Sequence, residues 1–182
     1  MASYFYLMSS LPMLKPDTEM PISYDDFLYN CKGNISDSKY EFLKNLSLDS
    51  EDGPLVKDWA KVYRKYKGEL TFQRSKKLGL PLNQNYDKDD SVGKVVSLAI
   101  ADENPLNAEK TLLSFLFGRL DLLIGTHDYD DYALFGYALK LKLLERKTVF
   151  NTEKGKAELD KLVKSLEEQI TKINWKLVYI GE

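Results

Sequence analysis

The sequence predicts an all-α protein: a single helical domain over residues 1–182, with about six or seven helices, a central antiparallel helical hairpin and little or no sheet. Apolar residues recur at spacings of three and four along most of the chain, which is typical of amphipathic helices. Capping residues, prolines and glycines divide these patterns into separate helices. A chain of 182 residues, 43% of them hydrophobic, is large enough for one core without disulfides or structural metal.

The composition excludes several classes of protein. With one cysteine (Cys31) and one histidine (His127), a Cys/His zinc site cannot be assembled within one chain. Cys31 fits best as a small core residue near the end of a helix. No stretch approaches about 18 consecutive apolar residues, and Met1–Met8 lacks the basic start of a signal peptide. We therefore expect a cytoplasmic protein.

The first part of the chain contains one expected extended segment and two helices. Residues 3–8 are rich in aromatic side chains and favour an extended conformation as far as Pro12. Ser23 is the expected N-cap of the next helix, and Gly33 its expected end. A capping box over Ser38–Glu41 then predicts the start of another helix.

A long amphipathic helix is expected from Pro54, which suits the first helical position. Its apolar side is formed by Leu55, Trp59, Val62, Tyr63, Tyr66 and Leu70. Four cations cluster on the opposite side: Lys57, Lys61, Arg64 and Lys65. The following residues, about 79–91, have no apolar period and predict a flexible loop. Helical spacing resumes at Val92.

The strongest prediction is an antiparallel helical hairpin over residues 105–124 and about 132–147. Asn104 and Pro105 mark its start, and Gly125 ends its first helix. Its second helix has little polar surface, so we expect the hairpin to form the core. Phe115 and Leu122 lie outside the main apolar side of the first helix, and they either contact the core or form a partner-binding patch.

A final helix is expected from about Thr152. Apolar residues recur in it with the strict spacing of a heptad: Leu159, Val163, Leu166, Ile170 and Ile173. Two arrangements fit this pattern. The helix either docks on the hairpin or forms the seam of a dimer.

Charge is distributed in blocks along the chain. Residues 54–77 hold 8 basic and 2 acidic side chains, whereas residues 78–135 hold 4 basic and 10 acidic ones. Such segregation either orients a binding partner or lets the chain neutralise its own charges on folding. The face of Lys57, Lys61, Arg64 and Lys65 is the best candidate for contact with an acidic protein, and the alternative is a face that is simply solvated.

Other kinds of site have weaker support. The only imidazole lies among carboxylates in His127–Asp131, where a metal or a general base is conceivable, but this segment also fits a turn and a helix cap. The chain has neither a phosphate-binding loop motif nor a dinucleotide fingerprint. The aromatic residues between the cations of 57–77 fall on the apolar side of the helix, which argues against nucleic acid. We expect no catalytic, cofactor or metal site and no nucleic-acid partner.

Several segments carry a resemblance to a known family. Residues 4–14 (YFYLMSSLPML) and 21–27 (PISYDDF) resemble the start of an uncharacterised bacterial family encoded among V/A-type ATPase genes. Residues 104–109 (NPLNAE) and 137–146 (YALKLKLLER) look like its second half. The family is similar to the socket subunit of these ATPases, the helical protein that joins the rotating central stalk to the membrane ring.

This resemblance implies an all-helical, non-catalytic structural or coupling component of a V/A-type ATPase. Its implied partners are the stalk and membrane-ring subunits, and it would lie at the inner face of the membrane only through them. The alternative is a cytoplasmic adaptor or regulator that binds other proteins and is not part of the rotor. A third possibility, an enzyme using His127, requires its neighbouring carboxylates to converge in a pocket.

Overall fold

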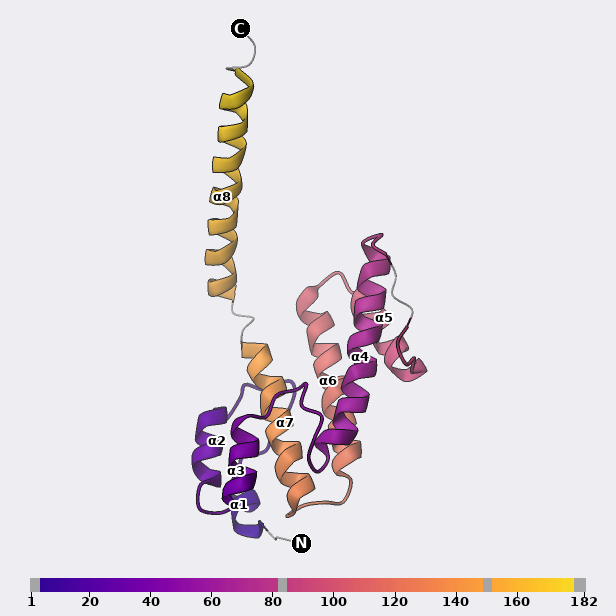
Figure 1. Cartoon of the computed structure of the whole chain (residues 1–182), viewed down its shortest axis with the longest axis vertical. Coiled ribbons are helices and arrows are strands. Elements are labelled where there is room, and N and C mark those ends of the chain that lie inside the picture. Colours follow the sequence, from indigo (N-terminus) through magenta and orange to yellow (C-terminus); the bar gives the residue numbers. More distant parts are fainter. Residues whose placement is uncertain (1–3, 82–84, 149–151, 179–182) are drawn as a thin grey trace. The chain divides into compact units, whose positions relative to one another are not determined.

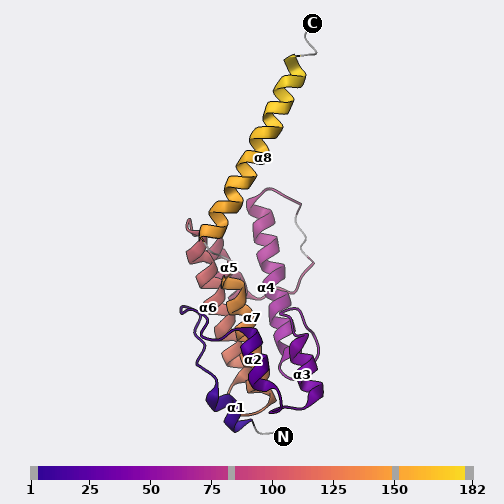
Figure 2. The same cartoon turned by 90° about the vertical axis from the view of Figure 1, so that its left-hand side faces the viewer.

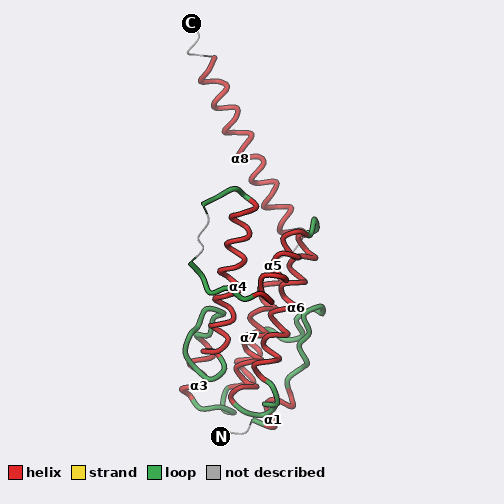
Figure 3. Tube along the Cα trace, turned by 90° about the vertical axis from the view of Figure 1, so that its right-hand side faces the viewer, coloured by secondary structure: helices red, strands yellow, loops and turns green. Residues whose placement is uncertain are grey.

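The computed structural model describes residues 4–81, 85–148 and 152–178. Within these ranges the chain forms helices joined by loops and turns, without strands (Figure 3). The eight helices are α1 (Phe5–Ser10), α2 (Tyr24–Cys31), α3 (Asp37–Lys44), α4 (Val56–Lys77), α5 (Asp90–Ala101), α6 (Pro105–Ile124), α7 (Asp131–Thr148) and α8 (Thr152–Val178) (Figure 1). The predicted all-α class is confirmed.

The chain divides into two compact units, Met1–Glu145 and Arg146–Glu182. The first unit contains one hydrophobic core, to which helices α1–α7 all contribute buried side chains. The second unit contains α8 and the last residues of α7. The prediction of one domain over residues 1–182, and that of α8 docked on the hairpin, stay predictions.

Helices α6 and α7 form the predicted antiparallel hairpin in the first unit (Figure 2). The Asn104 side chain accepts a hydrogen bond from the Leu106 amide, and Pro105 is the first helical residue, as predicted. The two helices meet beside their connecting turn, where Lys140 of α7 pairs with Asp121 of α6. An added Cβ on Gly136 would clash with Ile124 Cδ1, so glycine allows the close approach of the two helices.

Helix α4 runs parallel to α5. Three contacts show the direction: Gly93 lies beside Glu69, the Ser97 hydroxyl donates to Gln73, and the Lys77 ammonium donates to the Ile100 carbonyl. Because parallel neighbours cannot be joined by a tight turn, the segment between α4 and α5 must return along α4. This return path determines the candidate site described below.

The expected extended conformation of residues 3–8 is wrong for the residues described, because Phe5–Ser10 forms α1. Tyr4 and Leu7 are both buried, and a spacing of three places them on one side of a helix but on opposite faces of a strand. Tyr4 is held by distant residues: its amide donates to the Tyr129 carbonyl (2.7 Å) and its hydroxyl to Asp131 (2.8 Å). Tertiary contacts therefore override the local preference.

Three predicted boundaries are also wrong. Ser36, not Ser38, is the N-cap of α3, and starting the helix at Asp37 lets Lys39 reach Asp131, at 2.6 Å. Helix α4 begins at Val56 instead of Pro54, after Leu55 takes a left-handed conformation with φ of 60°. Leu55 is almost fully buried, and this burial offsets the strain. The loop predicted over 79–91 ends at Asp89, which caps α5.

The burial of α7 predicts how two leucine-to-alanine substitutions differ in their effect on stability. Leu134 of α7 is fully buried, whereas Leu122 of α6 is 74% exposed. We expect Leu134→Ala to lower the free energy of unfolding by about 2–5 kcal/mol through lost burial and a cavity, and Leu116→Ala, also buried, to behave alike. Leu122→Ala should change it by less than about 0.5 kcal/mol. Urea titrations measure these differences, and equal effects of Leu134→Ala and Leu122→Ala would contradict the central position of α7.

Candidate functional site

Helix α4 has one buried aromatic side. Trp59, Tyr63 and Tyr66 are buried, and their rings stack in series with centroid separations of 5.2 and 5.8 Å. Their burial was predicted from the spacing of three and four. Rings held in this way are not available as stacking platforms for bases. The absence of a nucleic-acid partner stays a prediction.

The other side of α4 carries the four predicted contact cations. Lys57, Lys61 and Arg64 are exposed, and the Lys65 side chain is 31% exposed. Three of the four form ion pairs within the chain: Lys61 with Asp58, Arg64 with Glu51, and Lys65 with Asp87. The chain thus neutralises part of this basic block itself, one of the two outcomes that the charge pattern allowed.

A fifth cation, Lys67, completes the basic surface. It pairs with Asp49, and its ammonium lies 5.2 Å from the centre of the Tyr63 ring. Four of the five cations line a groove of about 640 Å³ together with Phe72 and Tyr86: Lys61, Arg64, Lys65 and Lys67. The groove combines a positive rim with two aromatic rings. Sequence analysis missed Lys67, although its spacing of three from Arg64 places it on a neighbouring part of the same helix.

Tyr86 closes one side of the groove. It lies on the segment that returns along α4, and its ring packs against Phe72 with centroids 5.6 Å apart. An added Cβ on Gly68 would lie 2.9 Å from the Tyr86 side chain, so glycine in the middle of α4 makes room for this ring. A glycine inside a long helix was the one sequence signal for such a close approach.

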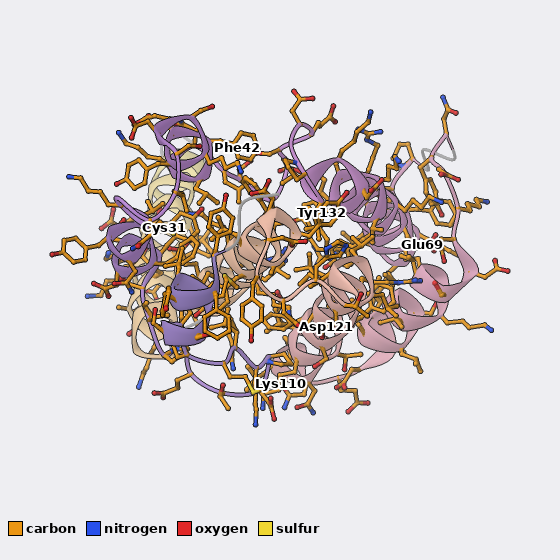
Figure 4. All side chains as sticks on the ribbon, turned by 90° about the horizontal axis from the view of Figure 1, so that it is seen from below. Cys31, Phe42, Glu69, Lys110, Asp121 and Tyr132 are labelled. Carbon is orange, nitrogen blue, oxygen red and sulfur yellow. The ribbon has the colours of Figure 1, made fainter. Side chains whose placement is uncertain are left out.

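The Tyr86 hydroxyl is anchored on a buried carboxylate. It donates to Glu69 Oε2 at 2.6 Å, while Gln73 Nε2 donates to Glu69 Oε1, also at 2.6 Å. Glu69 is only 8% exposed, and Figure 4 shows it among the ribbons of α4 and α5. Gln73 also donates to the Gly93 carbonyl, which links the carboxylate to α5. Burial, the hydrogen bond to Glu69 and the charge of Glu69 raise the pKa of Tyr86 to about 12.

The beginning of α5 is tied to α6 beside this network. The Asp89 carboxylate caps α5 by accepting from the Ser91 and Val92 amides, and it lies 3.8 Å from the Arg119 guanidinium. The hydrogen bond from the Ser91 hydroxyl, those from the two amides and the charge of Arg119 together lower the pKa of Asp89. Tyr86 and Asp89 therefore fix the second half of the predicted loop. Its predicted flexibility is untested.

His127 lies in a capping arrangement. Its side chain is 42% exposed, its ring stacks on Tyr132 at 4.6 Å, and its Nδ1 pairs with Asp130. Asp130 also accepts hydrogen bonds from the Tyr132 and Ala133 amides, so it caps α7. Among the described residues no three His, Cys, Asp or Glu side chains come together in a way that could hold a metal ion. The turn-and-cap interpretation of this segment is confirmed.

The two apolar candidates on α6 have different surroundings. Leu122 is exposed, whereas Phe115 is partly buried against the core and lies 5.1 Å from the Arg119 guanidinium. Arg119 therefore covers part of the Phe115 ring and leaves Leu122 as the exposed member. Whether either residue contacts a partner stays a prediction. Cys31, by contrast, is confirmed as a core residue, and burial raises the pKa of its thiol to about 12.

Comparisons with known proteins identified no relative of this chain. No family model, curated protein or solved structure matches the chain. The helices of the described residues include none that is both long enough and apolar enough to cross a membrane.

Removing one hydroxyl tests the Tyr86 anchor. Tyr86→Phe leaves the buried Glu69 carboxylate with one donor fewer, so we expect the free energy of unfolding to fall by about 1–3 kcal/mol. Tyr6→Phe removes a hydroxyl from a side chain that is 87% exposed and should be neutral within about 0.5 kcal/mol. Both values come from urea titration at neutral pH. Equal stability of the two variants would show that the return segment is not held by this bond.

The lowered pKa of Asp89 predicts a pH dependence. Its carboxylate is more acidic in the folded state than in the unfolded chain, where the pKa is about 3.9. Its stabilising contribution is therefore complete above the unfolded pKa and is lost as pH falls through the folded one. In Asp89→Asn this contribution is absent, so the difference in stability between the wild type and the variant should shrink below about pH 4. Denaturant titrations between neutral and acidic pH measure the difference in unfolding free energy between the wild type and Asp89→Asn. A difference that does not change with pH would contradict the lowered pKa of Asp89.

Proposed function

We propose that this protein is a non-catalytic structural or coupling component of a V/A-type ATPase. In this proposal it is similar to the socket subunit, which links the central stalk and the membrane ring. It binds its partner through the basic groove beside α4. The observation that carries the binding surface is the concentration of five cations on one side of this helix. Lys61, Arg64, Lys65 and Lys67 line the groove, and the exposed Lys57 lies one turn before Lys61. The choice of the ATPase rests on the resemblance of residues 4–14, 21–27, 104–109 and 137–146 to the family encoded with it. The all-helical architecture agrees with that resemblance.

The ion pairs within the chain are compatible with binding of an acidic partner. Asp58, Glu51 and Asp49 are each at least half exposed where they meet their cations. Exposed pairs of this kind contribute only about 0–1 kcal/mol each, because water and salt screen them. A carboxylate of a partner can therefore replace one of them at small cost. The interaction gains strength from several cations acting together and from steering at a distance.

The aromatic edge of the groove adds a contact that salt does not screen. Phe72 and Tyr86 line the same groove as the cations, and Lys88 lies over both rings, 5.7 and 5.9 Å from their centres. A partner helix with acidic residues beside one or two apolar side chains matches this combination of charge and aromatic surface. We place the acidic residues of the partner against α4 and its apolar residues against Phe72 and Tyr86.

Neutralising the basic face tests the proposal. Changing Lys57, Lys61, Arg64 and Lys65 all to glutamine should weaken association with purified V/A-type ATPase stalk and membrane-ring subunits, most strongly at low salt, where screening is least. Glutamine is preferred to glutamate here because a reversed charge would face Asp58, Glu51 and Asp87. Circular dichroism establishes that the variant is folded, and pull-downs at low and high salt compare binding.

A matched variant controls for the loss of four charges. Lys32, Lys76, Lys94 and Lys110 are exposed and lie outside the basic groove, and changing all four to glutamine should leave association intact. Equal weakening by both variants would mean that net charge, not this face, controls binding. If the wild-type protein does not bind the ATPase under any condition, the adaptor alternative replaces the proposal.

A further inference from the structure

Helix α8 carries an apolar surface that the described residues of its own unit do not cover. Leu159, Val163, Leu166 and Ile170 are between 43 and 59% exposed. Among the described residues of the second unit, only the end of α7 accompanies this helix. A helix with an apolar side of this kind is stable when a second surface covers that side. The covering surface must therefore come from outside the unit.

The spacing of these residues is that of a coiled coil. They alternate by four and three residues, and the register continues in the sequence at Ile173 and Leu177 within the helical backbone of α8. This assigns Leu159 and Leu166 to heptad position d, and Val163 and Ile170 to position a. β-Branched residues at a combined with leucine at d favour parallel dimers over larger bundles; Leu159, Val163, Leu166 and Ile170 have this order, whereas Ile173 at d and Leu177 at a reverse it.

The polar residues of α8 fit the same arrangement. Lys156 occupies the preceding a position, and a single lysine at a is one of the residues that fix register and oligomeric state. Glu158 and Lys161 form an ion pair at 2.6 Å at positions c and f, on the outer side of the helix. Among the side chains of α8 that the structure describes, the large apolar residues are thus close to the narrow a and d pattern of a coiled coil, with Leu162 as the one addition beside it.

Charge distinguishes the parallel from the antiparallel orientation. Asp160 and Glu167 occupy position e, whereas the described g position between them is Leu162. In a parallel pair the e position of one helix faces g of the other, so Glu167 meets Leu162 and no like charges oppose each other. An antiparallel pair brings e to e and places acidic side chains opposite one another.

We propose that α8 associates with α8 of a second copy of this chain, forming a parallel two-stranded coiled coil along Leu159, Val163, Leu166 and Ile170. The full-length protein is then a dimer whose two first units are tethered through their C-terminal helices. This dimer is independent of the proposed ATPase function, because the basic groove lies on α4 and contains none of these residues.

Sedimentation equilibrium of the full-length protein tests the proposal. The wild type should show a mass twice the 21.0 kDa of one chain at high concentration and dissociate on dilution. Val163→Lys combined with Ile170→Lys places two cations in the seam and should raise the dissociation constant at least about tenfold. Ser165→Lys combined with Thr171→Lys adds the same charge at positions c and b, outside the seam, and should change it less than about twofold.

The outcomes separate pairing of α8 with a second copy from any other cover of its apolar surface. A wild-type protein that stays monomeric at all concentrations overturns the proposal and leaves another part of the chain or a different protein as the cover. A dimer that is unaffected by the two seam substitutions overturns it too. Near-ultraviolet circular dichroism of each variant of the whole chain, which reports the packing of buried aromatic side chains such as Trp59, shows that loss of the dimer is not loss of the fold.

Orientation is tested by oxidative cross-linking. In a parallel pair the two copies of residue 156 face each other, so Lys156→Cys should give a disulfide-linked dimer under mild oxidation. In an antiparallel pair they lie at opposite ends of the seam and cannot be joined. Cys31 is fully buried, so the wild type serves as the blank. A dimer that does not cross-link through residue 156 contradicts the parallel arrangement.

Discussion

Helix α7 has almost no polar side within the first unit, and the need to cover it organises the helices around it. Three successive residues show this enclosure. The Phe135 ring meets Phe42 of α3, Gly136 accommodates Ile124 of α6, and the Tyr137 ring meets Phe27 of α2. Because consecutive residues of a helix point about 100° apart, these contacts cover α7 from different directions. Removing any one neighbour would expose part of the apolar surface that drives folding.

The reliability of the sequence analysis followed the range of the interactions involved. The α6–α7 hairpin was predictable because Asn104, Pro105 and Gly125 act within a few residues of themselves, and broad apolar patterns require a core. Helix α1 could not be predicted, because Tyr4 is held by Tyr129 and Asp131, which lie more than a hundred positions later in the sequence. A local pattern contains no information about partners more than a hundred residues away. The aromatic composition of residues 3–8 therefore suggested the wrong conformation.

The candidate site also has a part that could be predicted from the sequence and a part that could not. Helical periodicity was sufficient to place Lys57, Lys61 and Arg64 on one side of α4, because the spacing of side chains within one helix is fixed by its geometry. The bond between Tyr86 and Glu69 depends instead on the parallel packing of α4 and α5, which forces the connecting segment to return along α4. Gly68 inside α4 was the one sign of this arrangement in the sequence, and Tyr86, the partner of Glu69, comes from outside the helix.

The two surfaces proposed for association respond differently to solution conditions. The groove beside α4 is bordered by exposed ion pairs, whose strength falls as salt increases. The surface of α8 is dominated by aliphatic side chains, and salt hardly weakens their burial. The protein thus combines a contact that salt weakens, at the groove beside α4, with one that salt hardly affects, along α8. If both operate, high salt separates them: it releases the acidic partner from α4 while the pairing of α8 with a second copy persists.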